Sequence, residues 1–490
     1  MLIQVLSGRA ISPLLGTSLY TWTSVIGATL IGLTFGQAAG GYLADKNLDR
    51  RGLSQTFIAA GLAALSSNFL LAFFATRLAR YPMDLAFRSI MLALAVFGPV
   101  AFFLSMISPQ LAKMSVNDIA HSGTSIGRLS AAGAIGSLLG VGLGGYILIA
   151  AFGSQYLMSL VAMILLAIGW YIGLGQKIFK WNYAGFIAIV SLSNWLLPTH
   201  CLEESQYFCI RVKTEVIDEQ TRHTLRLDHL VHSYVNPNNP ADLGYGYEQV
   251  YARLLASRYR AEDTFHAYFI GGGGFVFPRY IEAFYPNATS TVSEIDPAVI
   301  KVNHEYLSLS PETKIQAVPG DARRFLMHPN DERYDIVFGD AFNDFGVPAH
   351  LTTKEFHQLL KSRMKPEGVY ALNLIDDGRY GYFLASMIQT LRTVWKHVEV
   401  APLSQGLERT RSTIVLIASD EPINQEAWLA ADPPSLQKLD PQDPVIEESK
   451  KILSIEDVDR LLKARNDVGV LTDDYAPLDR YLSPIFRDAK

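Results

Sequence analysis

The sequence predicts two architectures in succession: an α-helical transmembrane domain, then an α/β domain with a doubly wound parallel sheet and a small N-terminal β-hairpin layer. Three observations support this prediction. Long apolar runs fill residues 1–200, with charged side chains confined to short interruptions. Residues 201–490 hold most of the acids and bases. Short apolar runs alternate there with helical stretches, which is typical of a parallel sheet covered by helices. The predicted boundaries are 1–200 for the transmembrane domain, 201–245 for the β layer and a loop, 246–440 for the catalytic domain and 441–490 for a C-terminal helical tail.

The apolar runs of the first part predict a multi-pass membrane domain with six spans. Each run approaches the roughly 20 residues that a helix needs to cross about 30 Å of hydrocarbon. Residues 1–16 contain Arg9 and too few apolar residues for a complete extra span, so we expect a half-helix or an interfacial lead-in there. The six predicted spans are Leu19–Leu43, Phe57–Thr76, Ser89–Pro109, Leu129–Ala151, Tyr156–Gly175 and Asn182–Pro198.

The distribution of Lys and Arg between the loops predicts an orientation in the plasma (inner) membrane. Cytoplasmic loops carry an excess of basic residues. The loops after the first, third and fifth spans are richer in them than the other loops, so we place these three in the cytoplasm. Six spans then put the chain after Pro198 on the extracytoplasmic side. The basic residues of the cytoplasmic set include Lys46, Arg50, Arg51, Lys113, Arg128, Lys177 and Lys180.

The soluble half begins with β-strands and continues into the α/β domain. Gln206–Val212 and Thr224–Tyr234 alternate as strands do, around a polar turn. Residues 236–246 are rich in Pro, Asn and Gly and predict a loop. A helix is expected from Tyr247 onward, followed by strands at Ala267–Ile270, Thr291–Ile295, Lys314–Val318, Ile336–Phe338 and Val369–Leu374.

The most informative motif is the glycine run after the first strand of the α/β domain, Ile270-Gly-Gly-Gly-Gly274. A turn without side chains lets the backbone approach a ligand at the N-terminus of the next helix. Glu294 ends the following strand, twenty positions past Gly274, where a carboxylate accepts hydrogen bonds from a ribose diol. This spacing is typical of Rossmann-like sheets and predicts an adenosine-containing cofactor.

Acidic residues follow the second, third and fourth strands in order, at Glu294, Asp321 and Asp340. Each could have a structural role alone, since Asp321 could cap a helix and Asp340 could serve a turn. In a doubly wound sheet, however, ligands bind beyond the carboxyl ends of the strands. The ordered set therefore favours a nucleoside site. The net charge of −5 and the pI near 6.1 argue against nucleic acid as a partner, and we expect no metal.

On these motifs the sequence resembles the spermidine synthase family of polyamine aminopropyltransferases, in particular its membrane-fused bacterial branch with a helical domain similar to major facilitator transporters. The resemblance covers nearly the whole chain. Gly40-Gly-Tyr-Leu-Ala-Asp-Lys46 resembles a cytoplasmic loop motif of those transporters, and Leu471-Thr-Asp-Asp-Tyr-Ala-Pro477 resembles a closing motif of the fused branch. The remaining motifs are Ile270 to Gly274, Ser293-Glu-Ile-Asp-Pro297, Gly320-Asp321, Tyr334-Asp-Ile-Val-Phe-Gly-Asp340, Leu351-Thr-Thr-Lys-Glu-Phe356 and Met364-Lys-Pro-Glu-Gly-Val369.

The resemblance implies a transferase of polyamine biosynthesis, with decarboxylated S-adenosylmethionine as co-substrate and a polyamine such as putrescine as acceptor. The amine would attack a methylene beside the sulfonium, so one nitrogen must first lose its proton. Asp340 would be the catalytic aspartate, and Tyr247 would assist the deprotonation. The implied cofactor contacts are Gly271, Gly272, Gly273, Glu294 for the ribose, Asp321 for the adenine amino group, and His232 in place of a usual glutamine.

The sequence departs from the family pattern in both substrate sites. Gly274 stands where the soluble enzymes usually have an aspartate that binds the aminopropyl ammonium. Asn343 replaces a second loop acid, and Asp344 lies one position further and could substitute for it. Glu248 and Asp474 are further expected acceptor contacts. Adenosine recognition is therefore better supported than the identity of the transferred group.

The only two cysteines, Cys201 and Cys209, flank the start of the soluble half. They are either a pair of buried thiols or a disulfide, which would require an oxidising compartment. A disulfide would agree with the predicted extracytoplasmic position. The cytosolic origin of the implied co-substrate argues against that position, so both interpretations stay open.

Two other functions also stay open. A methyltransferase would bind ordinary S-adenosylmethionine through the same adenosine half, and would need a cation or a free helix N-terminus near Gly274 for its carboxylate. A transporter or sensor could bind polyamine or nucleoside without turnover, although the spans hold almost no ionisable residues at mid-depth. A polyamine and the lipid bilayer are the expected partners. The small residues of 131–145 suit close helix packing, with a homodimer as a hypothesis.

Overall fold

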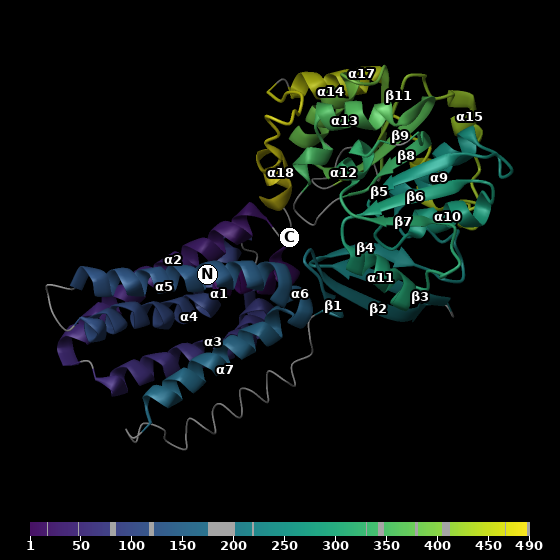
Figure 1. Ribbon diagram of the computed structural model, residues 1–490. Coiled ribbons are helices and arrows are strands. Elements are labelled where there is room, and N and C mark those ends of the chain that lie inside the picture. The colour runs from purple at the N-terminus through teal and green to yellow at the C-terminus, as the bar shows by residue number, and fades with distance from the viewer. Residues whose placement is uncertain are drawn as a thin grey trace. The chain divides into compact units, whose positions relative to one another are not determined.

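The computed structural model divides the chain into two compact units, Met1–Cys209 and Ile210–Lys490. The first unit is helical apart from a short strand at its end, and the second is an α/β domain that carries strands of a smaller sheet (Figure 1). The structure describes residues 1–16, 18–47, 49–78, 85–116, 122–174, 201–217, 220–329, 331–341, 347–377, 381–403, 412–465 and 467–487.

Five helices of the first unit are long and apolar enough to cross a membrane. They coincide with the first five predicted spans. The first four helices extend beyond the predicted bounds, whereas α7 ends at Ile172, before the predicted end at Gly175. The sixth prediction, Asn182–Pro198, lies outside the described residues. α1 (Leu2–Leu15) is shorter, as expected for a half-helix or lead-in. The five are α2 (Leu19–Asn47), α3 (Arg50–Leu78), α4 (Leu85–Ser115), α5 (Ser122–Leu143) with its continuation through the π-turn η2 (Gly144–Leu148) into α6 (Ile149–Phe152), and α7 (Ser154–Ile172).

Glycines set the closest helix contacts of this unit. A Cβ on Gly36 of α2 would lie 2.0 Å from Oγ of Ser105 in α4, so these helices pack at a separation that only glycine permits. The small residues predicted as a packing face behave differently. A Cβ on Gly133 or Gly136 of α5 would meet no atom within 4 Å, and α5 has no buried residue. Within the described part of the chain these two glycines have no packing partner, whereas Gly140 and Gly144 at the other end of this face adjoin Leu2 of α1.

The predicted hairpin belongs to a four-stranded sheet with the order β1-β2-β3-β4. The prediction of one strand over Thr224–Tyr234 is wrong, because Asp228 adopts a left-handed conformation (φ 49°) and turns the chain between two antiparallel strands. Cys201 and Cys209, whose state the sequence left open, form a disulfide. The strands are β1 (Glu203–Glu204), β2 (Cys209–Ile217), β3 (Gln220–Leu227) and β4 (Leu230–Val235).

The main sheet has seven strands in the order β10-β11-β9-β8-β5-β6-β7. The five predicted strands form its parallel part, as expected for a doubly wound sheet. β10 and β11 were not predicted, and β11 runs antiparallel to both β9 and β10. β10 and β11 follow one another in the chain and can pair antiparallel without a crossover helix. The strands are β5 (His266–Ile270), β6 (Thr289–Glu294), β7 (Gln316–Pro319), β8 (Tyr334–Gly339), β9 (Met364–Asp376), β10 (His397–Pro402) and β11 (Ser412–Ser419).

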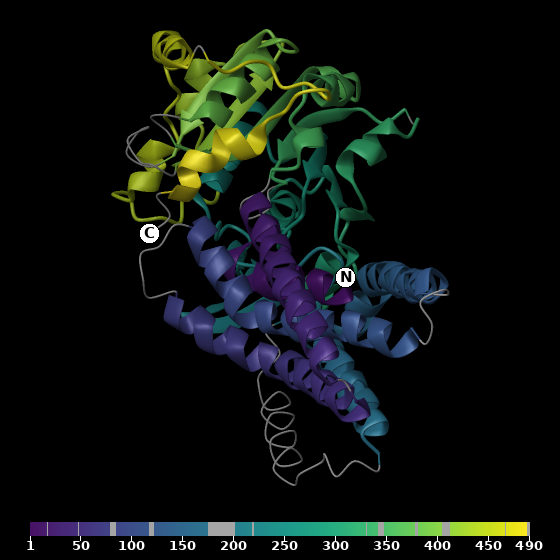
Figure 2. The same ribbon diagram turned by 90° about the vertical axis from the view of Figure 1, so that its left-hand side faces the viewer.

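Each face of this sheet has its own hydrophobic core, and different helices cover the two faces (Figure 1 and Figure 2). Alternation along β9 sends Leu372 and Leu374 into one core and Ala371 into the other. The first face carries α12 (Ala322–Met327), η3 (Ala349–Leu351), α13 (Lys354–Ser362), α14 (Tyr382–Arg392), α17 (Ile455–Ala464) and α18 (Leu478–Arg487). The second face carries α9 (Gly246–Arg258), α10 (Val276–Phe284) and α15 (Gln425–Ala430). α11 (Pro297–Tyr306) packs on β6 and β7, and α16 (Pro444–Glu448) lies in the C-terminal part.

Candidate active site

The glycine turn after β5 lies directly against the backbone of Asp340. The N–H of Gly271 donates to the carbonyl of Ser293 (2.9 Å), and the N–H of Asp340 donates to the carbonyl of Ile270 (2.9 Å). Gly271 has a φ of +95°, and a Cβ there would lie 2.6 Å from the carbonyl oxygen of Asp340. The turn therefore needs glycine at this position, and the sheet brings the predicted catalytic aspartate next to the predicted cofactor loop.

Glu294 is buried (5% exposed) at the end of β6 and binds the glycine turn. Its Oε2 accepts the N–H groups of Gly272 (2.9 Å) and Gly273 (3.3 Å), and its Oε1 accepts the N–H of Asp296 (3.0 Å). Burial raises the pKa of Glu294, and the three N–H donors oppose that rise. These N–H groups thus face a protein carboxylate, which retains acceptor capacity for hydroxyl groups of a ligand.

Gly274 is covered by β4, a contact that sequence reasoning missed. Its N–H donates to Oγ of Ser233 (2.8 Å), and a Cβ on Gly274 would lie 2.6 Å from Cβ of Ser233 and 2.8 Å from Cγ2 of Val235. An aspartate would therefore not fit here without a shift of β4. His232, predicted as a cofactor contact, precedes Ser233 in the same strand. No signal in the sequence marks Ser233, because only the fold brings β4 to the turn.

Two donors hold the carboxylate of Asp340. The hydroxyl of Tyr247, from α9, donates to Oδ2 (2.6 Å), and Nδ2 of Asn373, from β9, donates to Oδ1 (2.9 Å). Burial raises the pKa of Asp340, and both hydrogen bonds lower it. Burial and the nearby carboxylates of Asp340 and Glu248 raise the pKa of Tyr247 well above its usual value, so Tyr247 is a neutral donor rather than a base.

Asn373 is a second site residue that sequence reasoning missed. It is buried (5% exposed), and among the described residues its Oδ1 has no hydrogen-bond partner. The sequence did carry a signal, since Asn373 is the polar residue within the apolar run Val369–Leu374. An unpaired buried acceptor beside the predicted catalytic carboxylate is a point at which an N–H of a ligand can bind.

Glu248, predicted near the acceptor, is buried at the start of α9. Its Oε2 accepts the N–H of Tyr245 (3.0 Å), which caps the helix. Burial raises the pKa of Glu248 to about 8, and the charge of Asp340 contributes in the same direction. The charge of Asp340 thus acts on Glu248, although the two carboxyl groups have different hydrogen-bond partners.

Asp321 is the N-cap residue of α12. Its Oδ1 accepts the N–H of Arg324 (2.8 Å), and its Oδ2 lies 2.6 Å from Nε2 of His350. The structural interpretation of Asp321 as an N-cap is thus confirmed. The contact with His350 was not predicted, because it joins the N-cap of α12 to η3, 29 positions further along the chain.

Of the remaining predicted acceptor residues, the structure describes Asp474 but not Asp344. Asp344 and Asn343 are outside the described residues. Asp473 forms an ion pair with Arg323, and Asp474 follows it as an exposed turn residue. Within the described ranges, no hydrogen bond connects Asp474 to Tyr247, Asp340 or Asn373.

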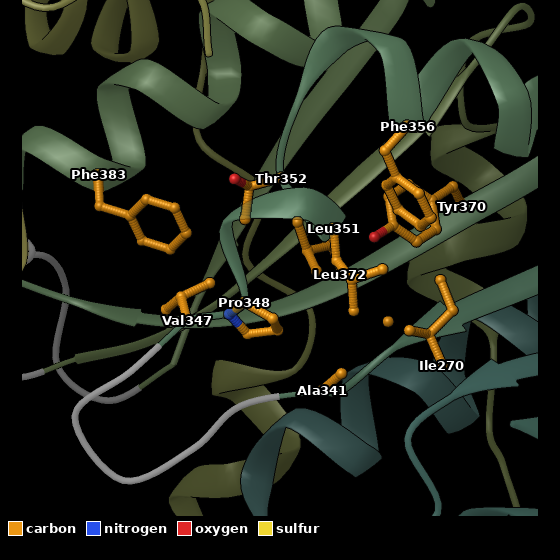
Figure 3. Close-up of a pocket in the computed structure, with 11 residues that line it drawn as sticks. Ile270, Ala341, Val347, Pro348, Leu351, Thr352, Phe356, Tyr370, Leu372 and Phe383 are labelled. Atoms are coloured by element: carbon orange, nitrogen blue, oxygen red, sulfur yellow. The ribbon is translucent and has the colours of Figure 1, made fainter. Parts of the chain in front are cut away.

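An apolar pocket lies beside the glycine turn, at the carboxyl ends of β5, β8 and β9 (Figure 3). In Figure 3, Pro348 and Leu351 lie between Phe383 on one side and Ile270 on the other. Such a lining suits an uncharged group rather than a charged one. Its lining residues are Ile270, Gly339, Ala341, Val347, Pro348, Leu351, Thr352, Phe356, Tyr370, Leu372 and Phe383.

Comparisons with known proteins point to the same region of the chain. The profile of the spermine/spermidine synthase domain matches residues 265–404. A polyamine aminopropyltransferase of Vibrio vulnificus is 30% identical over 112 residues, which cover 22% of this chain and 38% of that protein. One from Chromobacterium violaceum is 26% identical over 179 residues, covering 36% and 67%. An N-terminal histidine N-methyltransferase of Emericella nidulans is 33% identical over 110 residues, covering 22% and 19%.

The match covers the glycine turn, Glu294, Asp321, Asp340 and Asn373. It confirms the predicted family for this part of the chain, whose Rossmann-like sheet the structure also has. Residues 265–404 therefore form a domain of the spermine/spermidine synthase family.

Proposed function

We propose that this protein is an aminopropyltransferase that uses decarboxylated S-adenosylmethionine as co-substrate and a polyamine such as putrescine as acceptor. The observation that carries the proposal is the carboxylate of Asp340, which Tyr247 and Asn373 hold, in a residue whose backbone adjoins the glycine turn. A carboxylate in this position can accept a proton from an amine that attacks a donor bound at the turn.

The glycine turn supports a sulfonium nucleoside better than a dinucleotide. A pyrophosphate needs free N–H groups at such a turn. Here the N–H groups of Gly272 and Gly273 face Glu294, and that of Gly274 faces Ser233. A ribose, in contrast, offers hydroxyl donors to Glu294. The apolar pocket beside the turn suits the adenine ring.

In the proposed reaction, the acceptor nitrogen forms a bond to the methylene carbon beside the sulfonium. The carbon–sulfur bond breaks, and its electron pair stays on sulfur as a neutral thioether. Asp340 takes the proton that leaves the nitrogen. Tyr247 and Asn373 fix the carboxylate, so that amine and donor meet in line and much of the acceleration comes from proximity.

The substitution Asp340→Asn tests this proposal. We expect it to lower turnover by at least about a hundredfold, because the amine loses its proton acceptor. Binding of the neutral thioether product, 5′-methylthioadenosine, should change little. Mass spectrometry of products, with a panel of amines, measures turnover, and calorimetry measures binding.

A matched control lies at the other end of the same strand. Asp335 accepts the N–H of His266 (2.8 Å) and pairs with Lys365 (2.8 Å) at the start of β8. Asp335→Asn should leave turnover near that of the unmodified protein. Full turnover by Asp340→Asn, or equal loss by both variants, would contradict the proposed role.

A methyltransferase is the second candidate, favoured by the similarity to the Emericella methyltransferase. The same assay decides between the two functions, because each donor leaves a different product mass on the acceptor. Methylated products from intact S-adenosylmethionine, without aminopropyl products from the decarboxylated donor, would favour the methyltransferase.

We further propose that the helical unit anchors the protein in the membrane with the catalytic half outside the cytoplasm. Glu204, just before the α/β unit, accepts the N–H (2.9 Å) and the hydroxyl (3.0 Å) of Ser154 at the start of α7. The loop between α6 and α7 follows the fourth predicted span, on the side that is poorer in basic residues. The disulfide between Cys201 and Cys209 also suits an oxidising compartment.

A further inference from the structure

The C-terminal segment Leu471–Asp473, which we call the clamp, is fastened to the start of α13. The N–H of Lys354 donates to the carbonyl of Leu471 (2.8 Å), and the hydroxyl of Thr353 donates to Oδ1 of Asp473 (2.7 Å). The N–H of Asp473 donates in turn to Oε2 of Glu355 (3.0 Å). Three hydrogen bonds thus attach the clamp to a short stretch that is more than 100 positions earlier in the chain.

Asp473 also forms a bidentate ion pair with Arg323 of α12. Nη1 and Nη2 of the guanidinium lie 2.7 and 2.6 Å from the two carboxylate oxygens. Paired hydrogen bonds of this kind fix orientation as well as adding energy. The hydrogen bonds from Arg323 lower the pKa of Asp473 to about 2, so the carboxylate is charged at any working pH.

The same arginine connects the clamp to the residues of the candidate site. Nη1 of Arg323 donates to the carbonyl of His350 (3.0 Å), and Nε2 of His350 lies 2.6 Å from Oδ2 of Asp321. A continuous chain of polar contacts therefore runs from Asp473 through Arg323 and His350 to Asp321.

The residues around His350 form one wall of the apolar pocket. Pro348, Leu351 and Thr352 line the pocket from this segment (Figure 3). Arg323 holds the segment at His350, and the clamp holds the end of it at Thr353. The position of the wall thus depends on Asp473, although Asp473 does not line the pocket.

We propose that Asp473 and Arg323 are positioning residues for the nucleoside half of the donor. They fix the pocket wall and the Asp321–His350 pair, and the base binds between the wall and this pair. This inference rests on the proposed function, because the base belongs to an adenosyl donor. Loosening the clamp weakens binding of the base and leaves the amine site around Asp340 unchanged.

The test uses Asp473→Asn and Arg323→Gln in the full-length protein, purified in detergent. The probe is 5′-methylthioadenosine, which carries the base and ribose but no amine. We expect each variant to bind it roughly tenfold more weakly and to raise the KM of the donor equally, because the wall is displaced. The KM of the amine should stay within about twofold. The double variant should be no worse than either single one, because the two side chains act as a unit.

The pair Arg392–Asp459 provides a matched control. It joins α14 to α17 at 3.3 Å, and its side chains are also partly exposed. Asp459→Asn should bind methylthioadenosine as the unmodified protein does, and thermal unfolding of all variants shows whether they are folded. Unchanged binding by Asp473→Asn, or an equal rise in the KM of the amine, would overturn this inference alone. If the unmodified protein bound neither methylthioadenosine nor the donor, both the proposed function and this inference would be wrong.

Discussion

Asn373 shows how much the proposed catalytic role of Asp340 depends on one neighbour. Of the donors that the structure describes, Asp340 would keep only the Tyr247 hydroxyl if Asn373 were apolar. Its buried carboxylate would then be harder to keep charged, and its direction would be less fixed. The orphan Oδ1 of Asn373 would also be lost as an acceptor for the incoming amine.

We therefore expect Asn373→Leu to lower kcat by about ten- to a hundredfold while methylthioadenosine still binds normally. Asn373→Asp should be at least as impaired, because a second charge beside Asp340 raises the pKa of the pair further. Steady-state kinetics over a pH series measures both effects. An unchanged kcat in Asn373→Leu, with the protein folded, would mean that Tyr247 alone orients Asp340.

Glu248 and Asp340 make binding of a cationic amine depend on pH. Burial raises the pKa of Glu248 to about 8, so near neutral pH this carboxyl is largely protonated in the free protein. A bound cation stabilises the charged form and lowers the pKa of both groups. We expect the amine to release protons on binding and to bind more tightly as the pH rises from about 6 to about 8.

Calorimetry in buffers of different ionisation enthalpy measures this release. Glu248→Gln keeps an acceptor for the N–H of Tyr245 and should reduce the release. The raised pKa of Glu248 also makes the stability of the free protein depend on pH. The stability that neutral Glu248 contributes is complete below the unfolded pKa of 4.5 and is lost as the pH rises through about 8. Amine binding without any exchange of protons would contradict the coupling.

At the scale of elements, the site is built where four of them meet. β4 covers Gly274, α9 delivers Tyr247, and the ends of β8 and β9 deliver Asp340 and Asn373. The two strands that were not predicted, β10 and β11, contribute none of these residues. β10 and β11 add antiparallel strands beyond β9, whereas the strands that carry the glycine turn and the acids are parallel, so their carboxyl ends share one edge.

At the scale of the whole molecule, the proposed orientation predicts where the disulfide can be labelled. In intact cells treated with a membrane-impermeant reductant, Cys201 and Cys209 should react with an impermeant maleimide, because they precede a half that lies outside. In a background without these cysteines, Lys46→Cys marks the last turn of α2, next to the following loop, and should react only after permeabilisation. The opposite pattern would place the catalytic half in the cytoplasm.

The sequence by itself determined the features that depend on local patterns. Apolar periodicity predicted the long helices and the five parallel strands, and turn chemistry with strand ends predicted the glycine turn, Glu294 and Asp340. These features depend on short stretches of residues, so they can be predicted from a single sequence.

Only the tertiary structure decided which distant residues complete the site. Asn373 reaches Asp340 across 33 positions, Ser233 reaches Gly274 across 41, and Asp473 reaches Arg323 across 150. A hydrogen bond between such partners depends on the order of the strands and on the packing of the layers. Neither property can be predicted from a local pattern in the sequence. The same cause explains the missed antiparallel strands, whose place beside β9 is a matter of topology rather than composition.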